Sequence, residues 1–269
     1  MKISVIGAGN MGSALVRGLL ASGKAMPEMI SIFDIDPAKA LALQQELNVQ
    51  SVGDIGEAIE SDTDILILAV KPQTIEDVIL AIADKVHDAL VVISVAAGIS
   101  TGFILSLLNF PARIIRAMPN AAAMVGASAT ALCKAGSADD GDLEKALEIF
   151  SAIGLAVTVE EKMMNVVTAL SGSGPGYLFP FMEALTDGAV LMGLDRPTAR
   201  SLAGQTFMGA AIMALSGNEA FSELKDRITS PGGTTIAGLQ VMEQGGLRGI
   251  LMDAVQAAVL RAEELEGRK

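Results

Sequence analysis

Hydrophobic residues in the first 160 positions are grouped into short, almost continuous runs, with stretches of helical spacing between them. The runs lie at 2–6, 29–33, 64–70, 90–95 and 113–118, and weaker ones at 128–132 and 156–159. The helical stretches include 11–21, 37–47 and 75–85. Buried strands that alternate with helices are typical of a mostly parallel sheet covered on both faces. The pattern therefore predicts an α/β fold with a doubly wound sheet.

The strand pattern stops near residue 161, and only helical stretches follow, at 163–170, 175–192, 197–215, 220–227, 234–244 and 247–266. The stretch at 207–215 is apolar on nearly every side, and such a helix must be enclosed by other helices. A segment this short offers few partners within one chain. We therefore expect a second subunit to cover these helices, the alternative being a compact monomeric bundle. The expected domains are 1–160 and 161–269, the second being all-α.

The hydropathy of the chain raises the question of membrane insertion, because 51% of its 269 residues are hydrophobic. The longest uncharged runs, 89–112 and 163–182, are both interrupted by glycine and proline. Neither resembles the apolar helix of about 20 residues that a bilayer requires. The N-terminus leads directly into a strand and has no signal-peptide pattern. We therefore expect a soluble, cytoplasmic protein without a membrane partner.

Charge and residue usage exclude several other classes of protein. A net charge of −12 leaves no cationic cluster for nucleic acid. The single cysteine, Cys133, excludes an internal disulfide, and the single histidine excludes a histidine-cluster metal site, so no metal is expected. That histidine, His87, lies in a polar segment and is expected to be a solvated surface residue rather than a catalytic one.

The first motif with a chemical meaning is GxGxxG at residues 7–12, here called the glycine turn. It follows the first strand and opens the first helix, which is the order that a Rossmann-like dinucleotide site requires. Glycines let the backbone turn tightly and approach a pyrophosphate, and the N–H groups of the helix N-terminus bind the phosphates. The expected cofactor is NADH or NADPH, and the expected contacts are Gly7, Gly9, Asn10, Met11 and Gly12.

Further candidates lie at the ends of later strands. Asp34 follows the second strand, where a carboxylate commonly accepts hydrogen bonds from the adenosine ribose and repels a 2′-phosphate. Asp36 competes for this role, but Asp36 followed by Pro37 is typical of a helix N-cap. Lys71 follows the third strand, at the edge where open α/β sheets bind ligands, and is expected to contact the cofactor.

Five segments together resemble the pyrroline-5-carboxylate reductase family. They are the glycine turn, AVKP at 69–72, RAMPN at 116–120, SGSGPGY at 171–177 and, most specific, LKDRITSPGGTTIAG at 224–238. The resemblance covers essentially the whole chain. It implies NAD(P)H-dependent hydride transfer to the C=N bond of 1-pyrroline-5-carboxylate, which gives L-proline. It also implies a Rossmann-like domain followed by a helical dimerisation domain, in a homodimer or a larger ring of dimers.

The resemblance also implies the positions of the ligands. The nicotinamide is expected near 70–72, 96–98 and 118–120, which adds to the cofactor contacts Ala69, Val70, Lys71, Pro72, Ala97 and Asn120. The carboxylate of the cyclic imine is expected around residues 230–235, here called the SPGGTT turn. The expected substrate contacts are Ser171, Ser230, Gly232, Gly233, Thr234 and Thr235.

The residues of the SPGGTT turn also suit this chemistry by themselves. Pro231 fixes φ, two glycines permit left-handed backbone, and the threonines begin an apolar helix, so that exposed N–H groups form a site for a small carboxylate. The alternative is an ordinary helix-capping turn. A cyclic iminium already carries its proton, so its reduction requires mainly positioning. Thr235 or water is the expected proton donor to the ring nitrogen, and Lys71 is the second candidate catalytic residue.

Three other functions share parts of this pattern. A reductase of a six-membered cyclic imine stays open, because one methylene is worth only about 1–3 kcal/mol of discrimination. A non-catalytic NAD(P)-binding regulator is the alternative from another class. Enzymes similar to β-hydroxyacid dehydrogenases carry a catalytic lysine on the helical domain, and the corresponding segment 165–171 contains none.

Overall fold

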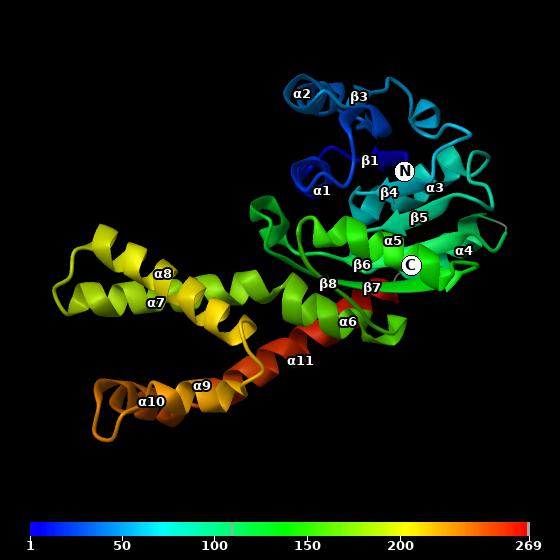
Figure 1. Ribbon diagram of the computed structural model, residues 1–269. Coiled ribbons are helices and arrows are strands. Elements are labelled where there is room, and N and C mark those ends of the chain that lie inside the picture. The colour runs from blue at the N-terminus through cyan, green and yellow to red at the C-terminus, as the bar shows by residue number, and fades with distance from the viewer. Residues whose placement is uncertain (109, 268–269) are drawn as a thin grey trace. The chain divides into compact units, whose positions relative to one another are not determined.

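The computed structural model describes residues 1–108 and 110–267. They divide into two compact units, the first being Met1–Ser173 with residues 258–267 and the second Gly174–Ala257. The first unit holds the whole sheet, and the second consists of helices (Figure 1). These units are defined by the contacts between residues and not by function. The expected division of function at residue 160 therefore stays a prediction.

The sheet of the first unit has eight strands in the order β3-β2-β1-β4-β5-β6-β7-β8. Neighbouring strands are parallel except β6 and β7, which are antiparallel. The order reverses between β1 and β4, and this switch point is where open α/β sheets bind ligands. The predicted doubly wound, mostly parallel sheet is therefore confirmed. The strands are β1 (Ile3–Ile6), β2 (Ile30–Phe33), β3 (Gln50–Ser51), β4 (Ile65–Leu68), β5 (Val91–Ser94), β6 (Arg113–Met118), β7 (Ser128–Gly136) and β8 (Gly154–Thr158).

Helices cover both faces of the sheet, as side-chain alternation along the strands requires (Figure 1). In β4, Ile65 and Ile67 face one hydrophobic cluster, while Leu66 and Leu68 face the other. The first cluster includes residues of α1 (Asn10–Ala21), α2 (Pro37–Leu47) and α5 (Asp140–Ser151). The second includes residues of α3 (Ile75–Ile82) and α4 (Thr101–Leu108). Burial on both faces explains why these strands are apolar at every position.

The structure differs from the predicted elements in two places. Strand β3 has only two residues, neither of them hydrophobic, so no hydrophobic run marked it. The helix predicted at 163–170 is a 3-10 turn, then α6 (Met164–Val167), then a π-helical turn at Thr168–Gly172. In that turn the N–H of Ser173 donates to the carbonyl of Thr168, five residues earlier. The hydroxyl of Ser171 donates to the carbonyl of Val167 in the same place.

The second unit consists of α7 (Gly174–Leu191), α8 (Arg196–Leu215), α9 (Phe221–Arg227), α10 (Thr234–Gln244) and most of α11 (Leu247–Glu266). Helices α7 and α8 pack against each other, but many large apolar side chains of this unit stay exposed. Leu191 is 85% exposed, Leu215 is 80% exposed and Met252 is 73% exposed. Across the described residues, no helix is both long and apolar enough to span a bilayer. Apolar surface on this scale is typical of a protein–protein interface.

We expect this surface to be covered by α7 and α8 of a second copy, so that the protein is an obligate dimer. Light scattering at assay concentrations should give the mass of a dimer or of a multiple of it. Ile212→Asp, which charges a half-exposed position of α8, should shift the mass towards that of a monomer. Leu41→Asp makes the same change on α2 of the first unit and should leave the mass unchanged. A folded and fully active wild-type monomer would contradict the prediction.

Candidate functional site

The glycine turn lies between β1 and α1 and packs directly against the end of β4. Gly7 has φ of +109°, and a Cβ there would lie 2.5 Å from the carbonyl oxygen of Ala69. A Cβ on Gly12 would collide with the carbonyl oxygen of Gly7. A Cβ on Gly9, by contrast, would meet none of the described atoms within 4 Å beyond its chain neighbours. Packing thus requires the first and third glycines, and the second faces open space.

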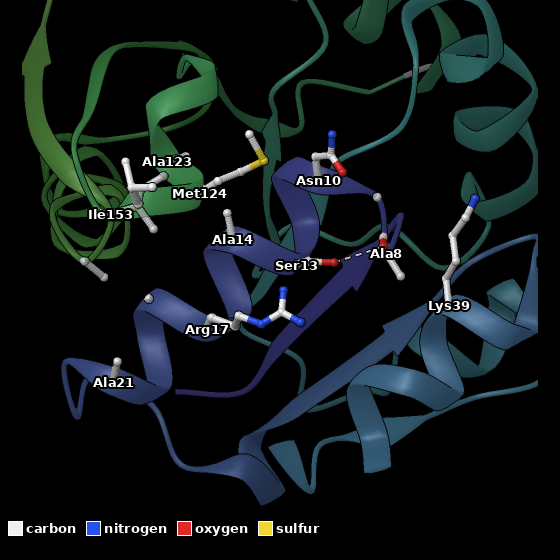
Figure 2. Close-up of a pocket in the computed structure, with 15 residues that line it drawn as sticks. Ala8, Asn10, Ser13, Ala14, Arg17, Ala21, Lys39, Ala123, Met124 and Ile153 are labelled. Atoms are coloured by element: carbon white, nitrogen blue, oxygen red, sulfur yellow. Dashed lines mark hydrogen bonds between the residues drawn. The ribbon is translucent and has the colours of Figure 1, made fainter. Parts of the chain in front are cut away.

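Helix α1 begins at this turn with free hydrogen-bonding capacity. Gly9 is its N-cap, no side chain in the described part of the chain caps it, and the first turn holds no acidic residue. The hydroxyl of Ser13 donates to the carbonyl of Ala8 over 2.9 Å and braces the turn (Figure 2). An uncapped helix N-terminus next to an open glycine attracts an anion. The glycine turn therefore fits the pyrophosphate of a dinucleotide.

Asp34 lies at the end of β2 and binds the glycine turn. Its Oδ2 accepts the N–H of Ala8 at 2.7 Å, its Oδ1 accepts the N–H of Asp36 at 2.9 Å, and its side chain is only 10% exposed. Lys39 Nζ lies 4.0 Å from Oδ1 of Asp34 and 3.6 Å from Oδ2 of Asp36. The sequence alone did not predict these contacts. A carboxylate oxygen has more than one acceptor position, so Asp34 retains capacity for a ribose hydroxyl.

Asp36 has the structural role that was expected from the sequence. It is the N-cap of α2, and its Oδ1 accepts the N–H of Ala38 at 3.2 Å. Pro37 occupies the first position of the helix, as predicted. Asp34 is therefore the carboxylate that faces the glycine turn, and Asp36 belongs to the helix.

Two cavities border the glycine turn within the first unit. One, of about 320 Å³, opens beside the switch point and is mostly apolar, and its lining includes Ile6, Gly7, Phe33, Asp34, Ile35, Ile55, Val70 and Val78. A mostly apolar cavity beside a carboxylate suits an adenosine group. The other, of about 600 Å³, follows α1 from Asn10 to Ala21, with Lys39 and Arg17 on one side and Met124 on the other (Figure 2). Arg17 is paired with Glu46 at 2.6 Å.

The residues expected near the nicotinamide lie at the carboxyl ends of β4, β5 and β6. Lys71 precedes the 3-10 turn that Pro72 begins, and its carbonyl accepts the N–H of Thr74 at 3.0 Å. Ala97 is exposed in the loop that follows β5. Because these strands run parallel to β1 in the same sheet, their carboxyl ends lie on the same edge as the glycine turn. The structure thus brings Ala69, Val70, Lys71 and Ala97 to the cofactor edge.

Asn120 follows β6, and its side chain has a local structural role. Its Oδ1 accepts the N–H of Ala122 at 3.1 Å, and its Nδ2 donates to the carbonyl of Ser171 at 3.0 Å. The side chain is therefore engaged in two contacts that the sequence did not predict. The second contact joins an expected cofactor residue to an expected substrate residue.

The SPGGTT turn lies in the second unit, between α9 and α10. Gly232 has φ of +68°, and the N–H of Gly233 donates to the carbonyl of Ser230 at 3.0 Å. Gly233 is the N-cap of α10, and within the described chain no side chain caps that helix. The N–H groups that open α10 are thus directed at the turn, where Thr234 and Thr235 add hydroxyls. This arrangement fits a small carboxylate better than a capped turn would.

The single histidine and the single cysteine lie away from this edge. His87 precedes the amino end of β5, at the opposite edge of the sheet. It is half-buried rather than solvated, which corrects the expectation, and its buried Nε2 has no partner among the described residues. Burial raises the pKa of the Cys133 thiol to about 11, so this cysteine stays protonated at neutral pH. Neither residue is placed to act on a ligand at the cofactor edge.

The open position of Gly9 gives a direct test of the cofactor site. We expect Gly9→Ala to weaken NADH binding by tenfold or more, about 1.4 kcal/mol, because its methyl would fill the open space in which we expect the pyrophosphate. Its melting temperature should stay unchanged, since Gly9 has an ordinary φ of −72°. Gly53→Ala, also in open space, should change neither property. Calorimetric titration and thermal melting measure both, and unimpaired binding in Gly9→Ala would place the pyrophosphate elsewhere.

Comparison with known proteins gives consistent matches for both parts of the chain. Residues 161–265 match the family described as Pyrroline-5-carboxylate reductase dimerisation, and residues 2–98 match the one described as NADP oxidoreductase coenzyme F420-dependent. The pyrroline-5-carboxylate reductase of Methanosarcina acetivorans is 45% identical over 100% of this chain and 98% of its own length. That of Escherichia coli is 36% identical over 98% of both chains.

Solved structures agree with the sequence comparison. A pyrroline-5-carboxylate reductase from Coxiella burnetii superimposes with a TM-score of 0.94 at 38% identity, over 98% of both chains. Pyrroline carboxylate reductase from Plasmodium falciparum, solved with NADP bound, gives a TM-score of 0.86 at 28% identity, over 99% of this chain and 98% of that one. Together with the glycine turn and the SPGGTT turn, these similarities show that the chain belongs to the pyrroline-5-carboxylate reductase family.

Proposed function

We propose that this chain reduces the C=N bond of 1-pyrroline-5-carboxylate with NADH or NADPH, which yields L-proline. The observation that carries the proposal is the pair of uncapped helix N-termini, one at the glycine turn and one at the SPGGTT turn. The first fits a pyrophosphate and the second a carboxylate. The names of the relatives point to the same substrate.

The two parts of the chain then have different tasks. Residues 1–160 bind the cofactor through the glycine turn and Asp34, with Lys71, Ala97 and Asn120 towards the nicotinamide. Residues 161–269 bind the substrate and form the dimer. Exposed apolar helices in the second unit and the match to a dimerisation family support this division. A ring of dimers and a cytoplasmic location stay predictions.

Little acid–base chemistry is required of the protein in this reaction. When bound, NAD(P)H supplies the hydride, which adds to the imine carbon. The SPGGTT turn holds the substrate carboxylate through the N–H groups of Thr234 and Thr235, so that the ring has one orientation. Orientation of this kind can supply about 7–11 kcal/mol of the barrier reduction. The hydroxyl of Thr235 is the proposed proton donor to the ring nitrogen. Ser171 is proposed as a further residue that contacts the substrate.

Steady-state kinetics with purified protein tests the function directly. We expect turnover of pyrroline-5-carboxylate with a higher kcat/KM than that of its six-membered homologue. A reversed ratio would assign the chain to the larger ring. Tight binding of NADH or NADPH without turnover of either imine would favour the non-catalytic regulator.

The role of Thr235 has its own test. We expect Thr235→Ala to lower kcat/KM by roughly 10- to 150-fold, since a hydrogen bond to a charged or reacting group is worth about 1.5–3 kcal/mol. Cofactor affinity should be unchanged, and Thr235→Ser should restore most of the activity. Thr229→Ala is the matched control, because that hydroxyl donates to the carbonyl of Lys225 instead. Full activity in Thr235→Ala would leave water as the donor.

Cofactor preference depends on Asp34 and Lys39. Repulsion between the carboxylate of Asp34 and a 2′-phosphate at 4 Å is worth roughly 4 kcal/mol at an effective dielectric constant near 20. The positive charge of Lys39, which lies 4.0 Å from Asp34, offsets much of this repulsion. We therefore expect NADH to be preferred by about tenfold, or about 1.4 kcal/mol. Asp34→Ser should shift kcat/KM towards NADPH, and Lys39→Gln should shift it further towards NADH, with little change in the KM of the imine. A strong preference of the wild type for NADPH would show that Asp34 does not face the ribose.

A further inference from the structure

An ionic cluster around a buried arginine in the first unit has no part in the function described so far. At its centre is Arg116 of β6, whose side chain is only 4% exposed. Its Nη1 donates to Oε1 of Glu161 at 3.2 Å and to Oε1 of Glu266 at 2.8 Å. Glu266 is the last residue of α11, and its Oε2 accepts from Nδ2 of Asn165 at 2.8 Å. The cluster therefore joins three segments that are far apart in the sequence.

Glu161 extends this cluster to the start of α4. Its Oε1 accepts the N–H of Thr101 at 2.7 Å, and its Oε2 accepts the hydroxyl of Thr101 at 2.6 Å. Thr101 is the first residue of α4 and is buried. A carboxylate 60 residues away thus satisfies both donors of Thr101 at this helix start. Burial raises the pKa of Glu161, but hydrogen bonds from Thr101 and Arg116 outweigh this effect and lower it, so the carboxylate is ionised at neutral pH.

The loop that leads into Thr101, residues 95–100, is at the cofactor edge. It leaves the carboxyl end of β5, and β5 is a parallel neighbour of β4 next to the switch point. It contains Ala97 and also Gly98, whose φ of +68° favours glycine. The last turn of α11 lies beside it, since a Cβ on Gly98 would be 3.8 Å from Cβ of Leu265.

Arg116 fixes the neighbouring strand by the same bonds. β6 pairs with β5 in parallel, and residues 118–120 leave β6 at the same edge as the loop. Glu161 contacts Thr101 with both oxygens and Arg116 with one. In this cluster, as the described residues show it, Glu161 is the side chain that bonds directly both to Thr101, where the loop meets α4, and to Arg116 of β6. Charge-assisted hydrogen bonds of this kind are among the strong ones.

We propose that Glu161 is a positioning residue that locks the loop at 95–100 against β6 and thereby fixes the place of the nicotinamide ring. This inference rests on the proposed function, because it assumes that a nicotinamide dinucleotide binds at this edge. A displacement of about 1 Å in a reacting group can cost a hundredfold in rate. A loop released from Glu161 should therefore affect the nicotinamide half of the cofactor and spare the adenosine half, which binds on the β2 side of the switch point.

The test compares Glu161→Gln with Glu160→Gln. The neighbouring Glu160 is a matched control, because its exposed carboxylate pairs with Lys162 and lies outside the cluster. Calorimetric titration measures the Kd of NADH and of ADP-ribose, which lacks the nicotinamide. For Glu161→Gln we expect the Kd of NADH to rise about fivefold or more and kcat to fall about tenfold or more, with the Kd of ADP-ribose and the KM of the imine within twofold of wild type. Glu160→Gln should match the wild type in all four values.

Thr101→Val keeps the shape of the side chain but removes one of the three bonds to Glu161, and Thr101→Ser keeps them all. We expect the valine variant to show a weaker form of the same pattern and the serine variant to bind NADH as the wild type does. This pair decides the question if Glu161→Gln fails to fold. Equal weakening of NADH and ADP-ribose, or no weakening of either, would overturn the proposal.

The binding measurements involve no imine. A wild-type protein that binds NADH but does not reduce pyrroline-5-carboxylate would refute the proposed function and leave the role of Glu161 to be decided by the titrations. Conversely, full turnover by the wild type with an unaffected Kd of NADH in Glu161→Gln would support the function and refute the role of Glu161.

Discussion

The close contact between the glycine turn and the end of β4 is the constraint on which the cofactor site depends. Gly7 lies so near Ala69 that a side chain would not fit, and Gly12 is just as tightly packed against Gly7. Since β1 and β4 flank the switch point, this contact fixes where α1 begins and where its N–H groups are directed. Asp34 then holds the turn from the other side through the N–H of Ala8. The phosphate site is thus shaped by backbone packing and by the carboxylate of Asp34.

Both candidate ligand sites are built around uncapped helix N-termini. The chain has a net charge of −12, so an anionic substrate and cofactor are bound by an acidic protein. Backbone N–H groups at α1 and α10 provide local positive potential without requiring a lysine or arginine. Such donors are fixed by the helix and lose little freedom when the ligand binds. This matches a reaction in which orientation contributes more than proton transfer.

Sequence patterns predicted the architecture well, because burial on both faces of a sheet leaves a clear hydrophobic run. The alternation of strands and helices up to about residue 160, the N-cap at Asp36 and the ends of α2 and α10 were predicted. Strand β3 was missed, because two polar residues make no such run. The π-helical turn was also missed. It depends on which carbonyl accepts the N–H of Ser173, and the periodicity of hydrophobic residues does not indicate that partner.

The side-chain contacts of the site were less predictable for a related reason. Glycine spacing identified the glycine turn, and the resemblance to a known family identified the SPGGTT turn, whose glycines and proline suit a tight turn. The contacts of Asp34 with Ala8, of Asn120 with Ser171 and of Arg116 with Glu266 join residues that are 26, 51 and 150 positions apart. Nothing in a single sequence marks such pairs. These residues come together only in the folded chain, once the strands have paired in register.

The buried and protonated thiol of Cys133 has a practical consequence for spectroscopy. It is the single cysteine of the chain, and its high pKa makes it a poor nucleophile towards maleimides and similar reagents. A cysteine introduced on the surface would therefore react selectively, without first removing the natural one. Pairs of such labels, one in each compact unit, would report the distance between the glycine turn and the SPGGTT turn in solution, with and without ligands.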